Sequence, residues 1–450
     1  MLSKMYFCVT DFIMRKKILV LGAGKSSSYL IKYLTEQAIA FEWQITIADS
    51  DIRAAQKKIG RNNFAQATWL DANNLNALTK LVSMNDLVIS LLPPSMHAEV
   101  AKICLLNRKH LVTASYLTEE MKALHKAAER AGVLFLNECG LDPGIDHMSA
   151  KKIIDDIHGQ KGSVFSFKSY CGGLIANEYD NNPWNYKITW NPRNIVLAGN
   201  QTARYLEDGK LQFIPPQRIF NQIEKIKING VLYDGYANRD SLSYINSYNL
   251  HSVQTMLRGT LRKSGFCEAW DVLVKIGVTD DSYKLNSSKI TYADLLEALM
   301  PSNNKSIKKK LEQFTNNPSV INKIAWLGLL EQNKISLRDA SPADALQHLL
   351  ERKWKLEKGD LDMILMQHLI SYKLKNKMHQ VTSTLQIEGE TEVYTAMSKT
   401  VGLPLGIAAK LILSKKIKEK GVAIPTQSSF YLPMLEELAK YDILFKEKKR

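Results

Sequence analysis

Two clusters of mostly polar residues follow the carboxyl ends of predicted strands and could take part in proton or hydride transfer. Thr113, Ala114, Ser115 and Tyr116 follow one apolar segment, and residues 137–144, NECGLDPG, follow the next. Hydride donors and acceptors meet at the carboxyl ends of parallel strands in open α/β sheets. Asp142, in the second cluster, is our candidate for an acid/base group or for the counter-ion of a substrate amine. The same turn could instead only join two domains, with Asp146 or Ser149 capping the next helix.

Two later residues could also contribute to a site. Cys171, in SYCGG, could move a proton if its thiolate is stabilised, although a free cysteine is more often a small buried apolar residue. Arg239, in YANRD, could bind a carboxylate or stand on the surface of a turn.

Residues 16–34, KKILVLGAGKSSSYLIKYL, place a glycine-rich turn between a predicted strand and a predicted helix. Gly22 and Gly24 let the chain turn tightly and approach a pyrophosphate at the helix N-terminus, which Lys25 and Ser26 begin. Ser27 stands where the full fingerprint has glycine or alanine. This pattern predicts a dinucleotide site, or else a domain of the same fold that binds no cofactor.

The second predicted strand, ITIAD, ends at Asp49. A carboxylate here accepts both ribose hydroxyls and repels a 2′-phosphate, so we expect NAD rather than NADP. Arg53, four residues later, could partly restore NADP binding, and Asp49 could instead merely cap the next helix.

Strands and helices alternate through the first third of the chain, which predicts a doubly wound parallel sheet of the α/β class. The expected strands are 18–21, 45–48, 87–90, 110–113 and 133–137, and the expected helices are 28–37, 53–59, 75–81, 98–106 and 119–131. Aromatic and β-branched residues then indicate a mostly antiparallel sheet, followed by strongly helical segments. We expect a dinucleotide-binding domain over 15–143, a mixed-sheet substrate domain over 144–265 completed by 375–395, an all-helical insertion over 266–374, and closing helices with a basic tail over 396–450.

Composition excludes several broad classes of protein. The chain has 450 residues, 45% of them apolar, so we expect two or three folded domains. The net charge of +15 comes largely from lysine runs without interleaved aromatic residues, so nucleic-acid binding is not expected. Uncharged stretches fall short of the ~20 apolar residues that span a bilayer, so no membrane association is expected.

Cysteine and histidine usage point to a reducing compartment and to no metal. The five cysteines are sparse and lack CxxC spacing, which predicts free thiols in a cytoplasmic protein. No HxxxH or HExxH pattern is present, so we expect no metal site. The first residues, MLSKMYFCVTDFI, lack the composition of a signal peptide, and we expect a disordered extension or a start at Met14.

Eight motifs occur in one order along the chain: KKILVLGAG, HLVTASY, NECGLDPGIDHMSA, SYCGGL, WNPRNIVLAG, YANRDSLSY, RGTLR and SKTVGLPLGIAAKLIL. Together they resemble the L-glutamate-forming saccharopine dehydrogenase (saccharopine reductase) family of lysine metabolism, from about residue 16 to 440. The resemblance implies a Rossmann domain, a mixed-sheet domain for substrate binding and dimerisation, and an inserted helical domain. It also implies NAD(P)-dependent oxidation of the secondary amine of saccharopine to an imine, which water splits into L-glutamate and 2-aminoadipate 6-semialdehyde.

The resemblance also implies roles for individual residues. The expected cofactor contacts, beyond the glycine-rich turn and Asp49, are Ala114, Ser115, Leu141, Asp142, Pro143 and Asn191. The expected substrate contacts are Ser115, Tyr116, Asp142, Cys171, Arg239, Thr260, Leu261 and Arg262. Three residues depart from the pattern of the family. Asn191 stands where the family often has a serine that contacts the cofactor. Ser27 replaces a third glycine, and Asp49 stands where NADP-using members lack an acid. A homodimer is also implied.

Two other functions remain open at this point. A related imine reductase of polyamine synthesis, of the carboxynorspermidine synthase type, would share the fold and the cofactor. A non-catalytic Rossmann scaffold protein would share only the fold. Arg239 and Arg262 favour a substrate with several carboxylates, and polar groups at strand ends favour an enzyme.

Overall fold

The computed structural model describes residues 15–450, so the expected N-terminal extension, Cys8 and the possible start at Met14 lie outside the described residues. The chain forms two compact units. Among the described residues, unit 1 contains residues 15–139 and 405–424, and unit 2 contains residues 140–404 and 425–450. A segment that we assigned to the closing helices therefore returns to the first unit.

Unit 1 is built on a seven-stranded, fully parallel sheet in the order β17-β6-β5-β4-β1-β2-β3. Its strands are β1 Lys17–Leu21, β2 Gln44–Asp49, β3 Ala65–Trp69, β4 Leu87–Ser90, β5 His110–Thr113, β6 Leu134–Leu136 and β17 Gly421–Ala423. The central strands are continuous apolar runs because both faces of the sheet are covered. The doubly wound α/β fold is confirmed.

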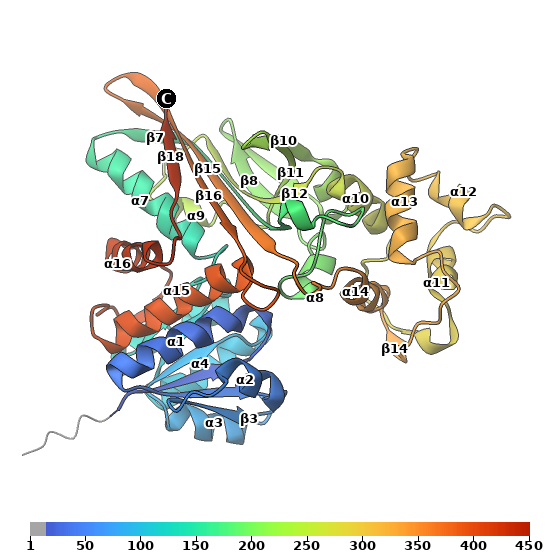
Figure 1. The fold of residues 1–450 in the computed structure, drawn as a ribbon. Coiled ribbons are helices and arrows are strands. Elements are labelled where there is room, and N and C mark those ends of the chain that lie inside the picture. The colour runs from blue at the N-terminus through green and yellow to red at the C-terminus, as the bar shows by residue number, and fades with distance from the viewer. Residues whose placement is uncertain (1–14) are drawn as a thin grey trace, which may run out of the picture. The chain divides into compact units, whose positions relative to one another are not determined.

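Helices cover both faces of this sheet (Figure 1). They are α1 Ser28–Phe41, α2 Ile52–Ile59, α3 Leu75–Ser83, α4 His97–Leu106, α5 Glu119–Ala123 and α6 His125–Ala131, with 3₁₀ turns η1 Lys25–Ser27 and η2 Pro94–Met96. Polar side chains fix where several of them begin. Asp51, Asn74 and Thr118 accept hydrogen bonds from the first-turn amides of α2, α3 and α5.

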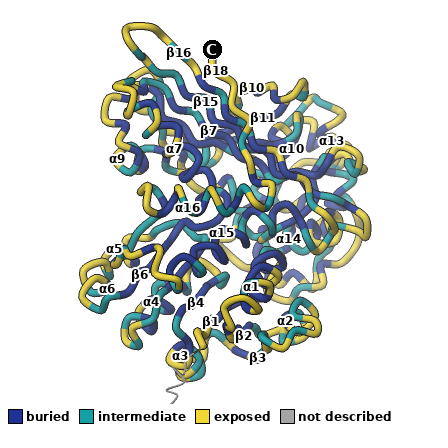
Figure 2. Tube along the Cα trace, turned by 60° about the vertical axis from the view of Figure 1, so that its left-hand side comes forward, coloured by how far each residue is buried: buried dark blue, intermediate teal, exposed yellow. Residues whose placement is uncertain are grey.

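Unit 2 contains a nine-stranded mixed sheet whose main order is β10-β11-β12-β7-β15-β16-β18, with β8 and β9 attached at β12. Its strands are β7 Ser163–Ile175, β8 Ala203–Glu207, β9 Lys210–Ile214, β10 Ile223–Ile228, β11 Val231–Ala237, β12 Thr255–Lys263, β15 Asp362–Leu374, β16 Lys377–Glu388 and β18 Lys446–Lys449. Only β12 and β7 pair in parallel. In Figure 2, β7 and β15 are buried along most of their length, whereas the ends of β16 and the whole of β18 are exposed.

One expectation about unit 2 is wrong. The insertion is not helical to residue 374, because 362–374 is the central strand β15. Its near-continuous apolar sequence is buried on both faces, and such a run does not distinguish a strand from a buried helix. The basic tail is exposed, and its residues Lys446–Lys449 pair with β16 as β18.

The helices of unit 2 fall into two groups. On one face of the sheet, α7 Ile145–Gly159 contacts α16 Ser428–Ala439 and the strands β7 and β15 (Figure 1). The other elements are α8 Pro192–Val196, α9 Tyr244–Ser247, α10 Phe266–Ile276, α11 Tyr292–Leu299, α12 Ile307–Leu311, α13 Pro318–Leu327, α14 Pro342–Lys353, the pair β13 Leu285–Asn286 and β14 Asp339–Ala340, and the turns η3 Asn177–Tyr179, η4 Pro216–Asn221 and η5 Ser287–Lys289. One apolar core joins α10–α14 to the sheet around Trp184, Trp270 and Trp354.

The helix α15, Ala396–Leu413, is the one helix among residues 15–450 that is long and apolar enough to cross a membrane. However, 78% of its apolar window is buried inside the protein, as in the core helix of a folded domain. Asp362 caps it by accepting hydrogen bonds from the amides of Ala396 (2.6 Å) and Met397 (2.9 Å).

Candidate functional site

The glycine-rich turn of unit 1 fits a dinucleotide. Gly22 has φ +101°, and a Cβ there would lie 3.3 Å from Leu91. A Cβ on Gly24 would meet no protein atom within 4 Å, so space for a ligand is open on that side of the turn. Lys25 and Ser26 follow on the exposed start of the helix, as expected. The turn can therefore hold a pyrophosphate close to its backbone.

A lysine that we did not predict reaches this turn from α2. Lys58 Nζ donates to the carbonyl of Ala23 (2.8 Å), to the carbonyl of Gly24 and to Ser27 Oγ (2.8 Å). Ser27 Oγ itself donates to the Gly24 carbonyl (2.8 Å), so serine at this position supports the turn. Burial lowers the pKa of Lys58 to about 8, while the nearby Asp49 opposes that shift.

Asp49 closes β2 and contacts the glycine-rich turn. Its carboxylate accepts hydrogen bonds from the amides of Ala23 (2.5 Å) and Asp51 (2.7 Å). The cap of α2 is Asp51, whose side chain accepts from the Arg53 and Ala54 amides. Asp49 is therefore not merely a helix cap, and its position suits a ribose contact.

Ser115, after β5, is held by His97, a residue that is not among the site residues predicted from the sequence. His97 Nε2 lies 2.8 Å from Ser115 Oγ and 3.2 Å from Thr113 Oγ1, and its Nδ1 lies 3.1 Å from Ser90 Oγ. Burial lowers the pKa of His97 to about 4, so the ring is neutral at physiological pH. His97 thus orients the Ser115 hydroxyl. Ala114 and Tyr116 are partly exposed beside it.

In unit 2, the segment GLDPGIDH folds into a tight turn before α7. Gly144 has φ +145°, and a Cβ there would lie 2.1 Å from the Gly140 carbonyl oxygen, so only glycine fits. The turn places Asp142 just ahead of the helix and Asp146 in its first turn. Leu141 and Pro143 are buried with it.

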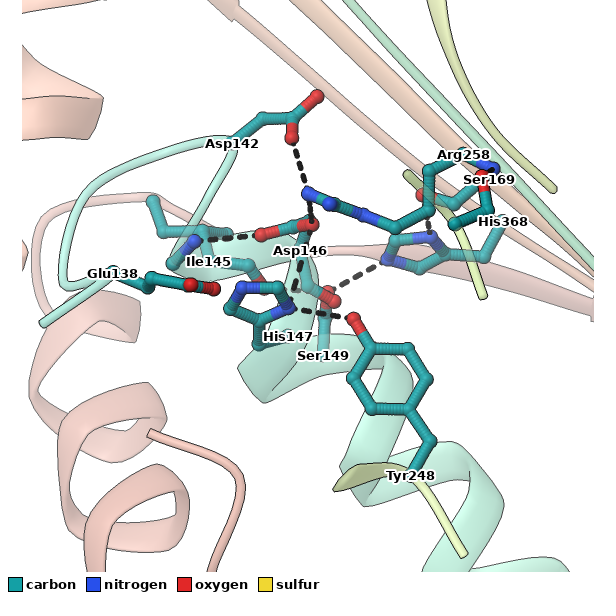
Figure 3. Close-up of polar contacts among 12 residues, drawn as sticks. Glu138, Asp142, Ile145, Asp146, His147, Ser149, Ser169, Tyr248, Arg258 and His368 are labelled. Atoms are coloured by element: carbon teal, nitrogen blue, oxygen red, sulfur yellow. Dashed lines mark hydrogen bonds and ion pairs between the residues drawn. The ribbon is translucent and has the colours of Figure 1, made fainter. Parts of the chain in front are cut away.

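Arg258, on β12, joins these two carboxylates. Its Nη2 donates to Asp142 Oδ1 (2.6 Å) and to Asp146 Oδ2 (2.7 Å), as Figure 3 shows. The Arg258 and Asp146 side chains are 4% and 2% exposed, whereas Asp142 is 16% exposed. The guanidinium also stacks over Tyr244, 4.3 Å from the ring centroid.

The two carboxylates differ in acidity. Burial raises the pKa of Asp142 to about 6, against the opposing effect of Arg258. Burial would also raise the pKa of Asp146, but His147, Arg258 and the Gly144 amide together hold it below its usual value. Asp142 is therefore the carboxylate that can exchange a proton near neutral pH, as general acid/base catalysis requires.

Further buried polar groups surround this pair (Figure 3). His147 Nδ1 lies 3.6 Å from Asp146 Oδ2 and 2.6 Å from Tyr248 Oη. His368, on β15, lies between Ser149 Oγ (2.7 Å) and Ser169 Oγ (2.9 Å). This network fixes α7 against the sheet.

Cys171, on β7, is a buried neutral thiol. Burial, reinforced by Asp142 and Asp146, raises the pKa of the thiol well above its usual value. The stabilised thiolate that we considered from the sequence is therefore not supported. Cys104, Cys139, Cys171 and Cys267 are all free thiols.

Arg262, two pleats along β12 from Arg258, is a buried cation without a carboxylate. It is 4% exposed, and no acidic side chain among residues 15–450 forms an ion pair with it. Its Nη1 donates to the Leu261 carbonyl (3.1 Å), but Nε has no hydrogen-bond partner. The rings of Tyr186, Tyr236 and Phe266 surround the guanidinium at 5.2–6.0 Å. An uncompensated buried charge of this kind suits a ligand carboxylate.

The other residues predicted to bind substrate or cofactor in unit 2 are Thr260, Arg239, Leu261 and Asn191. Thr260 pairs with Cys171 across the sheet, and Arg239, exposed in the turn after β11, is close enough to Asp142 to lower its pKa. Leu261 is fully buried, with its side chain in the apolar core, and its carbonyl accepts a hydrogen bond from Arg262. Asn191 is exposed and caps α8 by accepting from the Arg193 amide (3.0 Å).

Sequence reasoning missed Arg258, although a usable signal was present. Alternate residues of a strand share a face, so Arg258, Thr260 and Arg262 in RGTLR had to point the same way. Among residues 15–450, no group of three or more histidine, cysteine, aspartate or glutamate side chains is placed to hold a metal ion.

Comparisons with known proteins give a consistent result. Residues 18–136 match the family model of the saccharopine dehydrogenase NADP binding domain, and residues 140–444 match that of the saccharopine dehydrogenase C-terminal domain. The chain is 35% identical over 445 residues to the NADP(+), L-glutamate-forming saccharopine dehydrogenase of Schizosaccharomyces pombe, covering 96% of this chain and 98% of that one. It is 33% identical to the Saccharomyces cerevisiae enzyme of the same name, covering 97% and 99%.

A longer relative and a solved structure agree with this. The chain is 35% identical to an alpha-aminoadipic semialdehyde synthase of Arabidopsis thaliana, covering 90% of this chain but only 40% of that protein. The apo structure of the S. cerevisiae saccharopine dehydrogenase (L-Glu forming) superimposes with a TM-score of 0.86 at 32% identity, covering 97% of this chain and all of that one.

Proposed function

The chain belongs to the saccharopine dehydrogenase family, and we propose that it oxidises L-saccharopine with NADP⁺ to give L-glutamate and 2-aminoadipate 6-semialdehyde. The observation that carries the assignment to a substrate with several carboxylates is Arg262, a buried guanidinium for which residues 15–450 provide no carboxylate. On the same strand, Arg258 binds Asp142, a carboxylate able to exchange a proton near neutral pH.

The reaction needs binding, orientation and one proton acceptor. A nicotinamide nucleotide supplies the acceptor for the hydride that leaves the carbon next to the secondary amine. As this hydride leaves, the nitrogen loses its proton to Asp142 and a C=N bond forms. Water then adds to the imine, and the C–N bond breaks to release the amine of glutamate and the aldehyde. Arg262 and Arg239 bind substrate carboxylates and hold the reacting carbon in place.

The direct test is to incubate the purified protein with L-saccharopine and NADP⁺ or NAD⁺ and to identify the amino-acid product. Glutamate is the expected product. Lysine would mean that the bond on the other side of the nitrogen is cut, and no turnover with either cofactor would favour a polyamine-type substrate or a scaffold.

NADP rather than NAD is proposed because the matching domain family and the named fungal relatives are described as NADP-dependent. This differs from the NAD preference that Asp49 suggested. Two features of the turn are compatible with a 2′-phosphate: both Asp49 oxygens already accept backbone amides, and Lys58 brings a positive charge close by.

Replacing Asp49 by alanine tests this point. Without the carboxylate, the ratio of kcat/KM for NADP⁺ to kcat/KM for NAD⁺ is expected to rise about tenfold, because repulsion of the 2′-phosphate and the ribose hydrogen bonds are lost together. The ratio is measured from initial rates at fixed saccharopine. An unchanged ratio would remove Asp49 from the cofactor site.

Arg239→Ala provides a second test. Loss of one charge-assisted hydrogen bond to a substrate carboxylate costs roughly 1.5–3 kcal/mol, so the KM for saccharopine is expected to rise at least tenfold. The KM for the cofactor is measured in the same assays and is expected to stay constant. A saccharopine KM close to that of the unaltered enzyme would exclude Arg239 from the site.

We also propose that the protein is a homodimer, because of the family resemblance. We propose a cytoplasmic location because its cysteines are sparse. Light scattering coupled to gel filtration tests the first, and fractionation of cells tests the second.

A further inference from the structure

Arg258 is one cation shared by two anions. The same nitrogen, Nη2, lies 2.6 Å from Asp142 and 2.7 Å from Asp146, and all three side chains are largely buried. When both carboxylates are ionised, this group has a net charge of −1 in a region poor in water. Such an arrangement favours the uptake of one proton by one of the two carboxylates.

The contacts of Asp146 make it the carboxylate that stays ionised. Its Oδ1 accepts a hydrogen bond from the Gly144 amide (2.6 Å), and His147 Nδ1 lies 3.6 Å from Oδ2. Asp146 also sits in the first turn of the fifteen-residue helix α7, where the helix dipole stabilises negative charge. Asp142 is also the more exposed of the two, at 16% against 2%.

We propose that Asp146 and Arg258 are positioning residues that hold Asp142 in place and make it the proton acceptor in saccharopine oxidation. This proposal rests on the proposed function. Neither residue needs to touch the substrate, since both act through Asp142. Asp146 contributes a nearby negative charge that favours protonation of Asp142, and Arg258 contributes a positive charge that limits it.

Other charged and titratable groups also face Asp142. His147 comes from α7, Arg239 from the turn after β11, and Cys171 from β7. His147 and Arg239 both favour the ionised form of Asp142, whereas the thiol of Cys171 is neutral. Asp146 is therefore the one group among these neighbours whose charge favours the protonated form, which makes its removal a specific test.

The two substitutions are expected to shift the pH dependence in opposite directions. At acid pH, kcat/KM for saccharopine is expected to fall as Asp142 becomes protonated, and we call this fall the acid limb. Asp146→Asn keeps the shape of the side chain and removes its charge, so the acid limb should move down by about one pH unit. Arg258→Gln removes the cation, so the same limb should move up by about one pH unit. A purely structural role would lower activity in both variants without moving the limb.

Asp156→Asn serves as the matched control, because Asp156 lies on the exposed side of α7 and pairs with Lys152 (3.1 Å). It should leave the limb where it is. If Arg258→Gln fails to fold, Asp146→Asn compared with Asp156→Asn still tests the proposal, because only the first of these removes a charge from the buried cluster. Shifts in the same direction for Asp146→Asn and the Arg258 variant, or no shift in either, would overturn the proposal.

A second readout separates this proposal from the function on which it rests. Carbon-13 labelling of the aspartate side chains reports the titration of Asp142 in the free protein, without turnover. Opposite shifts of this titration in the Asp146 and Arg258 variants would support the positioning role even if saccharopine is not the substrate. An unshifted titration in a protein that turns over saccharopine would overturn the positioning role alone.

Discussion

Arg262→Met is expected to raise the KM for saccharopine by about 10²–10³-fold and to leave the KM for the cofactor unchanged. The guanidinium is 4% exposed and surrounded by aromatic rings, so its removal leaves a substrate carboxylate without a charged partner in a largely apolar environment. Loss of a charge-assisted pair of hydrogen bonds in such a site costs ~3–4 kcal/mol, which corresponds to that change in KM. Initial rates over a range of saccharopine concentrations measure it.

The same variant separates binding from stability. Because Arg262 has no carboxylate partner among residues 15–450, its removal breaks no ion pair and relieves a buried charge. The free Arg262→Met protein is therefore expected to unfold at the same temperature as the unaltered one, or higher. Arg262→Lys should be intermediate in KM, since an ammonium cannot bind a carboxylate through two parallel hydrogen bonds.

The matched control for Arg262 is the next residue of β12. Lys263 carries the same charge but points to the opposite face, where it pairs with Asp180 (3.0 Å). Lys263→Met should leave the saccharopine KM within about threefold of the starting value. If both variants raised the KM equally, a general loss of positive charge rather than a specific carboxylate site would be the cause.

The central part of each sheet could be predicted from the sequence, and the exceptions have physical causes. The strands at 18–21 and 87–90 were found because both of their faces are buried, which makes the whole run apolar. β3, AQATW, was missed because it is a half-exposed edge strand with no apolar run. β15 was taken for helix because a long apolar run in a strand buried on both faces shows no alternation.

Within the site, motif residues could be predicted, but residues that act through tertiary contacts could not. Asp142 was found through its place after a strand. Lys58 has no sequence signal, since its contacts with Ala23, Gly24 and Ser27 span more than thirty residues and depend on how α2 packs. His97 was not predicted, because a histidine in a loop is most often a surface or capping group. Its role depends on the approach of β4 and β5, which brings Ser90 and Ser115 to its two nitrogens.

Asp142→Asn is expected to reduce kcat for saccharopine oxidation by about 10²–10⁴-fold and to abolish the acid limb of the pH profile. The pKa of Asp142, raised by burial, is about 6. Below this pH the carboxyl is protonated and cannot accept the proton of the amine, so oxidation by the unaltered enzyme should decline as the pH falls through 6. The amide has no such transition. The reverse reaction needs the protonated acid, so its rate should change with pH in the opposite sense.

Stability gives an independent check on the same residue. The pKa of Asp142 is higher in the folded protein than the usual value of about 3.9 for an unfolded chain. The stabilisation that comes from protonated Asp142 is therefore complete below about pH 3.9 and is lost as the pH rises to about 6. Asparagine resembles the protonated acid and does not ionise. Between pH 4 and 6, the free energy of unfolding of Asp142→Asn should therefore increase relative to that of the unaltered protein. The difference should remain constant at higher pH.

Cys171 decides whether the limb belongs to Asp142 alone. Burial keeps its thiol neutral throughout the range in which Asp142 titrates, so Cys171→Ala should leave the acid limb near pH 6 even if activity falls through altered packing. A limb that survives in Asp142→Asn and vanishes in Cys171→Ala would reverse the assignment. That result would require Cys171 to be a thiolate, although the negative charges of Asp142 and Asp146 both disfavour a thiolate there. The geometry of the site therefore supports the carboxylate of Asp142 as the proton acceptor.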